Sequence, residues 1–423
     1  MRIGGTPGLM CSIATRSCPV DNRVFGHRNI EAKLSVTDET IFPICSLTMA
    51  FTAAAIGILV DEKELSWDTL VKDVLPTFNP RDERLKNRLT ITDRLCHRSG
   101  MSESNNIVLG SENNILISSQ DGVPFINTQT HEPAYLHPRF GFNNLNYGLV
   151  GSVIEQVSGQ SYPDFLQTRI LNPLGFDRTF LKPPLPNTPN VARCYNTLDD
   201  AIPTPIPGPK AGSDGFAGPG AGMWSCSRDL MKFYRDFLAA LKDQLDTKLS
   251  STPSSPFKNL DHLTSPKIYL WRTGLHAGLS YACGWARTTF PSSLGQLGLN
   301  LGLSPGGRPV IGKDIAYPKE LLFHQGSLPG ALASVMLLPE TETVILVLSN
   351  ALARTDVADW VGQLVLQEVL CVPAQGRVDF KAYAEKAVAE NLKWYSAIAA
   401  ELSEKRWAGA AKGVGGVCGY VLE

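Results

Sequence analysis

A serine at the start of an apolar segment is the residue in this sequence that most readily suggests chemistry. Ser46 stands in "ICSLTMAF", residues 44–51, and the segment continues as "TAAAIGILVDE". This nearly continuous apolar run predicts a buried helix that begins near Ser46. The amino terminus of a helix stabilises negative charge, so the hydroxyl is a candidate nucleophile. Serine is also a favoured helix cap, and that interpretation stays open.

A serine nucleophile needs a neighbouring group that accepts its proton. The side chain one helical turn later belongs to Met49, whose thioether cannot act as a base. A second stretch, "HQGS" at residues 324–327, offers His324, and an imidazole titrates near neutral pH. His324 is therefore a candidate base for Ser46. Further candidates for contact with a substrate are Gln325, Gly326, Trp224 and Tyr281.

Strand patterns lie at both ends of the sequence, and helix patterns lie between them. "LASVMLLPETETVILVLSN" contains two apolar runs joined by a short polar turn, which predicts a hairpin. We therefore expect an α+β fold: an antiparallel sheet built from both termini, flanked by helices, with an inserted, mostly helical lobe. The expected division is a discontinuous sheet domain at 1–61 and 265–410, a helical lobe at 62–264, and the start of a truncated C-terminal segment at 411–423.

Several segments resemble one superfamily in the same sequence order. They are "FPICSLTMAFTAAAIGILVDEKELSWD", "LCHRSGM", "NNLNYGLVGSVIEQVSG" and "FHQGSLPGALAS". Together they resemble the serine β-lactamase and penicillin-binding protein superfamily, in its class C and esterase-like branch. Within that branch the sequence looks most similar to fungal β-lactamase-like proteins of secondary metabolism, such as the lovastatin acyltransferase. The resemblance implies a serine β-lactamase/transpeptidase-like fold.

The resemblance also implies a set of site residues. Members of the superfamily use a serine, a lysine three residues later and a Tyr-x-Asn motif to move the proton. Ser46 matches the serine, but Met49 takes the place of the lysine. In "FNN", residues 142–144, Phe142 takes the place of the tyrosine, whereas Asn144 matches the asparagine. The shape of the pocket is therefore expected to survive without its proton relay.

The resemblance further places an oxyanion hole, formed by the backbone N–H groups of Ser46 and Ser327. Backbone donors of this kind do not depend on side chains. Three functions follow in order of preference. The first is a secondary-metabolite tailoring enzyme that uses the pocket for cyclisation, isomerisation or elimination rather than for an acyl-enzyme. The second is a serine esterase or acyltransferase in which His324 is the base. The third is a binding protein without catalytic activity.

Composition narrows the range of partners. Net charge is −1 with both signs interspersed, which argues against nucleic acid. The nine cysteines form no CxxC or Cys/His pattern, so no metal or other cofactor is expected. We find no membrane-spanning stretch and no signal peptide, and we expect a cytoplasmic protein. Its expected partner is a small natural product. If the acyltransferase alternative holds, an acyl-carrier or CoA thioester is a second expected partner. The sequence leaves the oligomeric state open.

Overall fold

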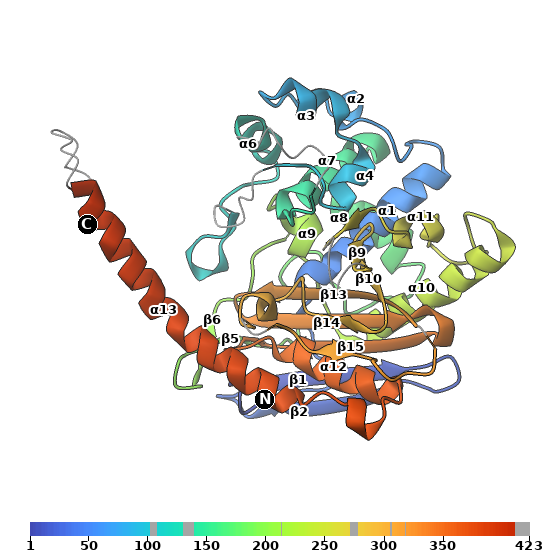
Figure 1. The fold of residues 1–423 in the computed structure, drawn as a ribbon. Coiled ribbons are helices and arrows are strands. Elements are labelled where there is room, and N and C mark those ends of the chain that lie inside the picture. The colour runs from blue at the N-terminus through green and yellow to red at the C-terminus, as the bar shows by residue number, and fades with distance from the viewer. Residues whose placement is uncertain are drawn as a thin grey trace.

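A large antiparallel sheet organises the molecule (Figure 1). The computed structural model describes residues 1–101, 108–129, 139–212, 214–270, 278–304, 307–317 and 319–410. In this described part the sheet has nine strands in the order β3-β2-β1-β15-β14-β13-β10-β9-β8. They are β1 (Gly8–Ala14), β2 (Asp21–Asn29), β3 (Leu34–Ser35), β8 (Ile268–Tyr269), β9 (Ser280–Tyr281), β10 (Ala286–Thr289), β13 (Glu320–Leu328), β14 (Ala331–Leu338) and β15 (Thr343–Ser349).

The order of the strands joins the two ends of the chain. β1 pairs with β15, so that Leu9 lies opposite Ser349. The predicted hairpin is the β14–β15 pair, in which Leu338 lies opposite Thr343. A sheet built from both termini is therefore confirmed. The domain boundaries expected from the sequence stay a prediction, and residues 411–423 lie outside the described residues.

Helices cover both faces of the sheet. The longer ones are α1 (Thr48–Asp61), α7 (Asn144–Ser158), α10 (Ser227–Thr247), α12 (Val357–Val369) and α13 (Phe380–Ala410). Shorter helices are α2 (Val71–Val74), α3 (Glu83–Arg88), α4 (Ile91–Leu95), α6 (Gly122–Thr128), α8 (Tyr162–Leu166), α9 (Gly218–Ala221) and α11 (Leu260–Thr264). α12 packs on β14 and β15, and α10 packs on β15 and β1. α13 extends away from the rest of the molecule (Figure 1).

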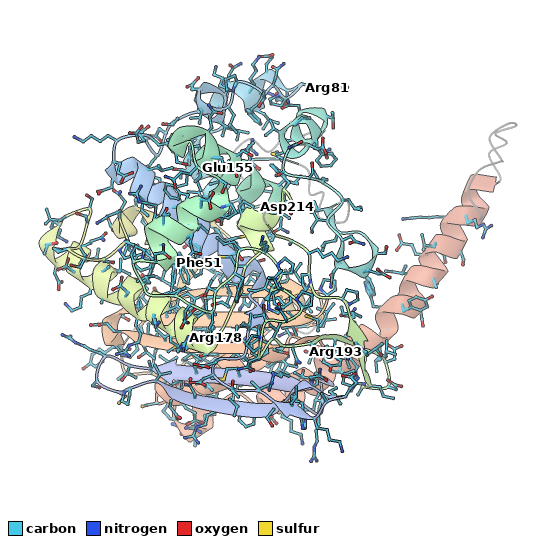
Figure 2. All side chains as sticks on the ribbon, turned by 180° about the vertical axis from the view of Figure 1, so that it is seen from behind. Phe51, Arg81, Glu155, Arg178, Arg193 and Asp214 are labelled. Carbon is cyan, nitrogen blue, oxygen red and sulfur yellow. The ribbon has the colours of Figure 1, made fainter. Side chains whose placement is uncertain are left out.

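The largest buried cluster lies between the sheet and the helices around α1. α1 is buried along nearly its whole length, as its apolar sequence predicts. The ring of Phe51 stacks on Phe233 of α10 with 3.9 Å between centroids. Seen from behind, Phe51 lies just above the sheet (Figure 2). This packing fixes α1, and therefore the turn in front of it, against the sheet.

Local sequence signals set the ends of α4 and α7. Gly159 ends α7 in the left-handed conformation (φ 67°). The capping box of Thr90 and Asp93 at the start of α4 is also present. α4 ends at Leu95. The reason is local, because His97 already adopts a left-handed φ of 56°.

Candidate active site

Ser46 lies in a single turn of 3₁₀ helix, Cys45–Leu47, immediately before α1. Cys45 has a φ of 50°, a left-handed conformation that is uncommon for a residue other than glycine and is often found at functional sites. Leu47 is the N-cap residue of α1, and neither turn has a side-chain cap. The interpretation of Ser46 as a helix cap is therefore wrong. Its hydroxyl forms no hydrogen bond with any residue of the described ranges.

The thiol beside Ser46 belongs to the packing rather than to the chemistry. Cys45 is fully buried, and burial raises the pKa of its thiol well above the ordinary value. A thiol that stays protonated is a poor nucleophile.

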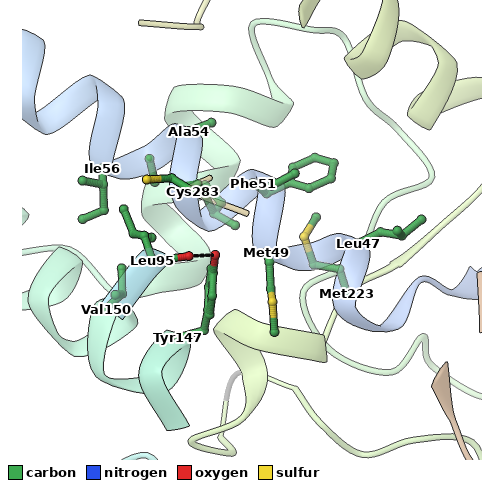
Figure 3. Close-up of a cluster of buried hydrophobic side chains, with 14 of the residues drawn as sticks. Leu47, Met49, Phe51, Ala54, Ile56, Leu95, Tyr147, Val150, Met223 and Cys283 are labelled. Carbon is green, nitrogen blue, oxygen red and sulfur yellow. Dashed lines mark hydrogen bonds between the residues drawn. The ribbon is translucent and has the colours of Figure 1, made fainter. Parts of the chain in front are cut away.

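Met49 follows Ser46 by one turn and is fully buried. It lies among apolar side chains of α1 and its neighbours (Figure 3). Its Sδ is 3.9 Å from the hydroxyl of Tyr281 on β9. Gly284 brings the β9–β10 turn close to this part of α1: a Cβ there would lie 3.0 Å from the Met49 carbonyl oxygen, and its φ is +79°. The turn thus holds the Tyr281 phenol next to the helix face that follows Ser46.

β13 passes directly beside the Ser46 turn. A Cβ added at Gly326 would lie 2.9 Å from both the Cys45 Cβ and the Ser46 backbone nitrogen, so only glycine permits this approach. β10 pairs with β13 from Glu320 to Phe323. The predicted oxyanion donors, the N–H groups of Ser46 and Ser327, therefore belong to two backbone segments in close contact, and their role stays a prediction.

His324 has both ring nitrogens engaged. Its Nδ1 is 2.6 Å from the backbone oxygen of Gln325, and its Nε2 is 2.9 Å from the hydroxyl of Tyr281. A carbonyl oxygen can only accept, so Nδ1 carries the proton and Nε2 accepts from the tyrosine. Burial lowers the pKa of His324 to about 4. The imidazole is therefore neutral at neutral pH, and its single lone pair is occupied by the Tyr281 hydroxyl.

The rings of Phe142 and His97 lie close to the Tyr281–His324 pair. The ring of Phe142 lies 6.4 Å from His324 and 4.5 Å from His97, between centroids. His97 is buried and accepts a hydrogen bond at Nδ1 from the backbone N–H of Asn143, 3.2 Å away. Burial and the nearby His324 lower the pKa of His97 to about 3. His97 is thus a neutral support for the segment that carries Phe142.

Tyr147 belongs to the helix packing. Its hydroxyl donates to the backbone oxygen of Leu95 at 2.7 Å (Figure 3). Its ring is fully buried and lies 5.2 Å from that of His97. This hydroxyl serves the contact between α4 and α7.

Three of the predicted residues have other surroundings. Gln325 alternates with His324 along β13 and faces α12, where its Nε2 donates to the Asp359 carboxylate at 2.9 Å. Trp224 is buried in a separate apolar cluster with Ile41 and Cys194. The structure therefore does not bring the Gln325 and Trp224 side chains to Ser46. Asn144 begins α7, and its Oδ1 lies beside Gly220 of α9.

The structure thus brings together Ser46, Met49, Phe142, Tyr281, His324 and Gly326. The direct bond between Tyr281 and His324 is the feature that sequence reasoning missed, because no pattern links two residues on β9 and β13. The described residues contain no group of three or more His, Cys, Asp or Glu side chains suited to a metal ion. In the same ranges, no helix is long and apolar enough to cross a membrane.

This fold and site geometry define a serine β-lactamase-like protein, and comparison with known proteins agrees. The Beta-lactamase family profile matches residues 1–367, so the chain belongs to that family. Penicillin-binding protein 4 of Amycolatopsis lactamdurans is 28% identical over 150 residues, covering 36% of this chain and 38% of that protein. Protein flp of Staphylococcus aureus is 23% identical over 368 residues, covering 82% of this chain and 60% of flp. The alignments therefore span less than two thirds of these relatives.

Solved structures show the same fold. The octameric penicillin-binding protein homologue from Pyrococcus abyssi superposes with a TM-score of 0.66 at 24% identity, over 86% of this chain and 74% of that one. A class C β-lactamase from Rhodobacter sphaeroides gives 0.60 at 18% identity, over 92% and 95% of the two chains. At these identities the similarity establishes the fold and leaves the reaction to the site itself.

Proposed function

We propose that the protein is a tailoring enzyme of secondary metabolism, located in the cytoplasm, that uses a β-lactamase-like pocket without forming an acyl-enzyme. Its substrate is a polyketide- or terpenoid-type small molecule, and its reaction is a cyclisation, isomerisation or elimination. Such reactions pass through an enolate or alkoxide, which hydrogen-bond donors in a fixed position stabilise. The donors here are the backbone N–H groups of Ser46 and Ser327, close to the Tyr281–His324 pair.

One observation carries this proposal: His324 is not a free base. Its Nδ1 proton is held by the Gln325 carbonyl, and its Nε2 accepts from Tyr281. With a pKa near 4 it would hold a proton from serine poorly. A neutral serine without a base is a weak nucleophile. The arrangement therefore favours binding and orientation of a substrate over acylation of Ser46.

Active-site labelling tests the proposal directly. The purified protein is incubated with a fluorophosphonate, a nitrophenyl ester and a penicillin, and its intact mass is recorded. We expect no adduct at Ser46. A stoichiometric, covalent adduct there would contradict the proposal and support the esterase or acyltransferase alternative.

The class of reaction is read from the products. A host that makes polyketides and terpenoids is compared with and without the gene by mass spectrometry. An isomerase or cyclase leaves the mass of its substrate unchanged, an elimination lowers it by the leaving group, and an acyltransferase raises it by an acyl group. A Ser46→Ala variant should keep the first two outcomes. If no metabolite changes, the binding-protein alternative is favoured.

A variant designed to gain esterase activity tests whether the rest of the pocket is intact. Met49→Lys together with Phe142→Tyr restores the two side chains that the family uses at those positions. Because the Ser46 turn and the β13 approach at Gly326 are in place, we expect the double variant to hydrolyse nitrophenyl esters at least about 100-fold faster than the unaltered protein. Met49→Lys alone should give less. A double variant as inactive as the parent would show that the pocket has also lost its backbone donors.

A further inference from the structure

Arg94 is a buried charge in the helical region, next to the contact between Leu95 and Tyr147. It lies on α4, is fully buried, and contacts the ring of Phe78, whose centroid is 5.3 Å from the guanidinium carbon. Burying an isolated charge costs several kcal/mol, so buried arginines are normally paired with a carboxylate. Among the described residues no carboxylate lies within 4 Å of this guanidinium. The neighbouring Asp93 is paired with Arg98 instead.

The two acceptor atoms that Arg94 contacts among the described residues carry no negative charge. Its Nη1 donates to the Asn146 side-chain oxygen at 2.9 Å and contacts the Met101 sulfur. Its Nε and Nη2 have no partner among the described residues, and the same is true of the Asn146 Nδ2. Asn146 is also fully buried. Because its oxygen faces the guanidinium, its amide orientation is fixed and its N–H groups point elsewhere.

The position of Asn146 adds to the positive potential. It lies in the first turn of α7, a helix of 15 residues, whose amino terminus carries the positive end of the helix dipole. Burial lowers the pKa of Arg94 only to about 9, which leaves the guanidinium charged at neutral pH. Two nitrogens of a fully buried, positively charged guanidinium, unpartnered within the described part of the chain, therefore lie near a helix amino terminus. Water would satisfy the donors but would not neutralise the charge.

We propose that Arg94 and Asn146 bind a small monovalent inorganic anion of the size of chloride. The Phe78 ring and the Met101 side chain beside the guanidinium are apolar, which favours a small monovalent anion over a multivalent oxyanion that needs more donors. Binding to the folded state alone stabilises it by mass action. The anion thus holds α4 to α7, the helix that begins at Asn144, and this role is independent of the reaction at Ser46.

Thermal unfolding in matched salts tests the proposal. Chloride and bromide should raise the Tm by about 3 °C with a saturable dependence, relative to gluconate at the same ionic strength. The surface variant Arg228→Met, whose side chain is paired with Glu39 and Asp177, should keep this dependence. Equal Tm values in chloride and gluconate would overturn the proposal.

A variant with a carboxylate in place of the proposed anion distinguishes loss of anion binding from misfolding. Asn146→Asp places a carboxylate against Arg94, so it should be at least as stable as the unaltered protein in gluconate and insensitive to chloride. Crystals grown in bromide should show an anomalous peak within about 3.5 Å of the Arg94 Nε or Nη2. A chloride response that persists in Asn146→Asp, or crystals without that peak, would also contradict the site.

Discussion

The Tyr281–His324 bond can be tested by removing one oxygen atom. Tyr281 is fully buried, His324 is 2% exposed, and the two polar atoms are 2.9 Å apart. Tyr281→Phe keeps the ring and leaves the Nε2 lone pair of His324 without a donor. An unsatisfied buried acceptor costs about 1–3 kcal/mol, so we expect the free energy of unfolding to fall by about 2 kcal/mol. Urea unfolding at pH 7 measures the difference.

A matched control separates this bond from the general effect of losing a phenol. Tyr234 is equally buried, and its hydroxyl has no partner among the described residues. Tyr234→Phe should therefore change stability by less than about 0.5 kcal/mol. Nitrogen NMR of the histidine ring gives a second reading: His324 should be neutral at pH 7, with its proton on Nδ1. Equal losses in the two variants, or a proton on Nε2, would refute the reasoning.

Three further predictions concern the surroundings of the same strand. Gly326→Ala should destabilise the protein by about 2 kcal/mol, because its Cβ would meet the Ser46 turn. Gly141 has open space around it, so Gly141→Ala should change the free energy of unfolding by less than about 0.5 kcal/mol. Urea unfolding midpoints compare the two variants. Burial lowers the pKa of His324 from 6.5 to about 4, so between these pH values only the unfolded chain binds a proton at this residue. The urea midpoint should therefore fall when the pH is lowered from 7 to 4.5. The fall should be smaller in His324→Asn. Burial and Asp359 raise the pKa of Asp356 from 3.8 to about 8, so the folded protein keeps a proton that the unfolded chain has already released. The free energy of unfolding should therefore decline from pH 6 to pH 8.5. This pH dependence should vanish in Asp356→Asn.

The sequence predicted the fold well because its signals were local and strong. The buried helix after Ser46 and the β14–β15 hairpin follow directly from apolar runs and turn residues. The pairing of the first strand with the last depends on contacts distant in sequence. That pairing was inferred from the strand patterns at the two ends of the sequence, and the structure confirmed it.

The site was predicted less completely, for a geometric reason. Ser46, Met49 and His324 lie at recognisable positions in short motifs. The side of the sheet that a strand residue faces depends on register, and a shift of one residue reverses it. Gln325 was therefore named as a candidate for contact with a substrate, although it faces Asp359 on α12. Tyr281 was chosen as a pocket residue, but its hydrogen bond to His324 depends on the packing of β9.

The apolar side chains of Met49 and Phe142 and the Tyr281–His324 bond form a consistent set. A lysine ammonium at position 49 would project beyond the present Met49 sulfur, which already lies 3.9 Å from the Tyr281 hydroxyl. Such a charge stabilises the phenolate and repels a proton on His324, and it would itself need a partner in a fully buried place. Methionine instead offers a long, neutral side chain with a weak acceptor. A tyrosine in place of Phe142 would bring a second hydroxyl toward a histidine whose nitrogens are both engaged. With methionine at position 49 and phenylalanine at position 142, the bond between the phenol and the imidazole has no competitor from these two side chains, which is the arrangement that a neutral hydrogen-bonding site requires.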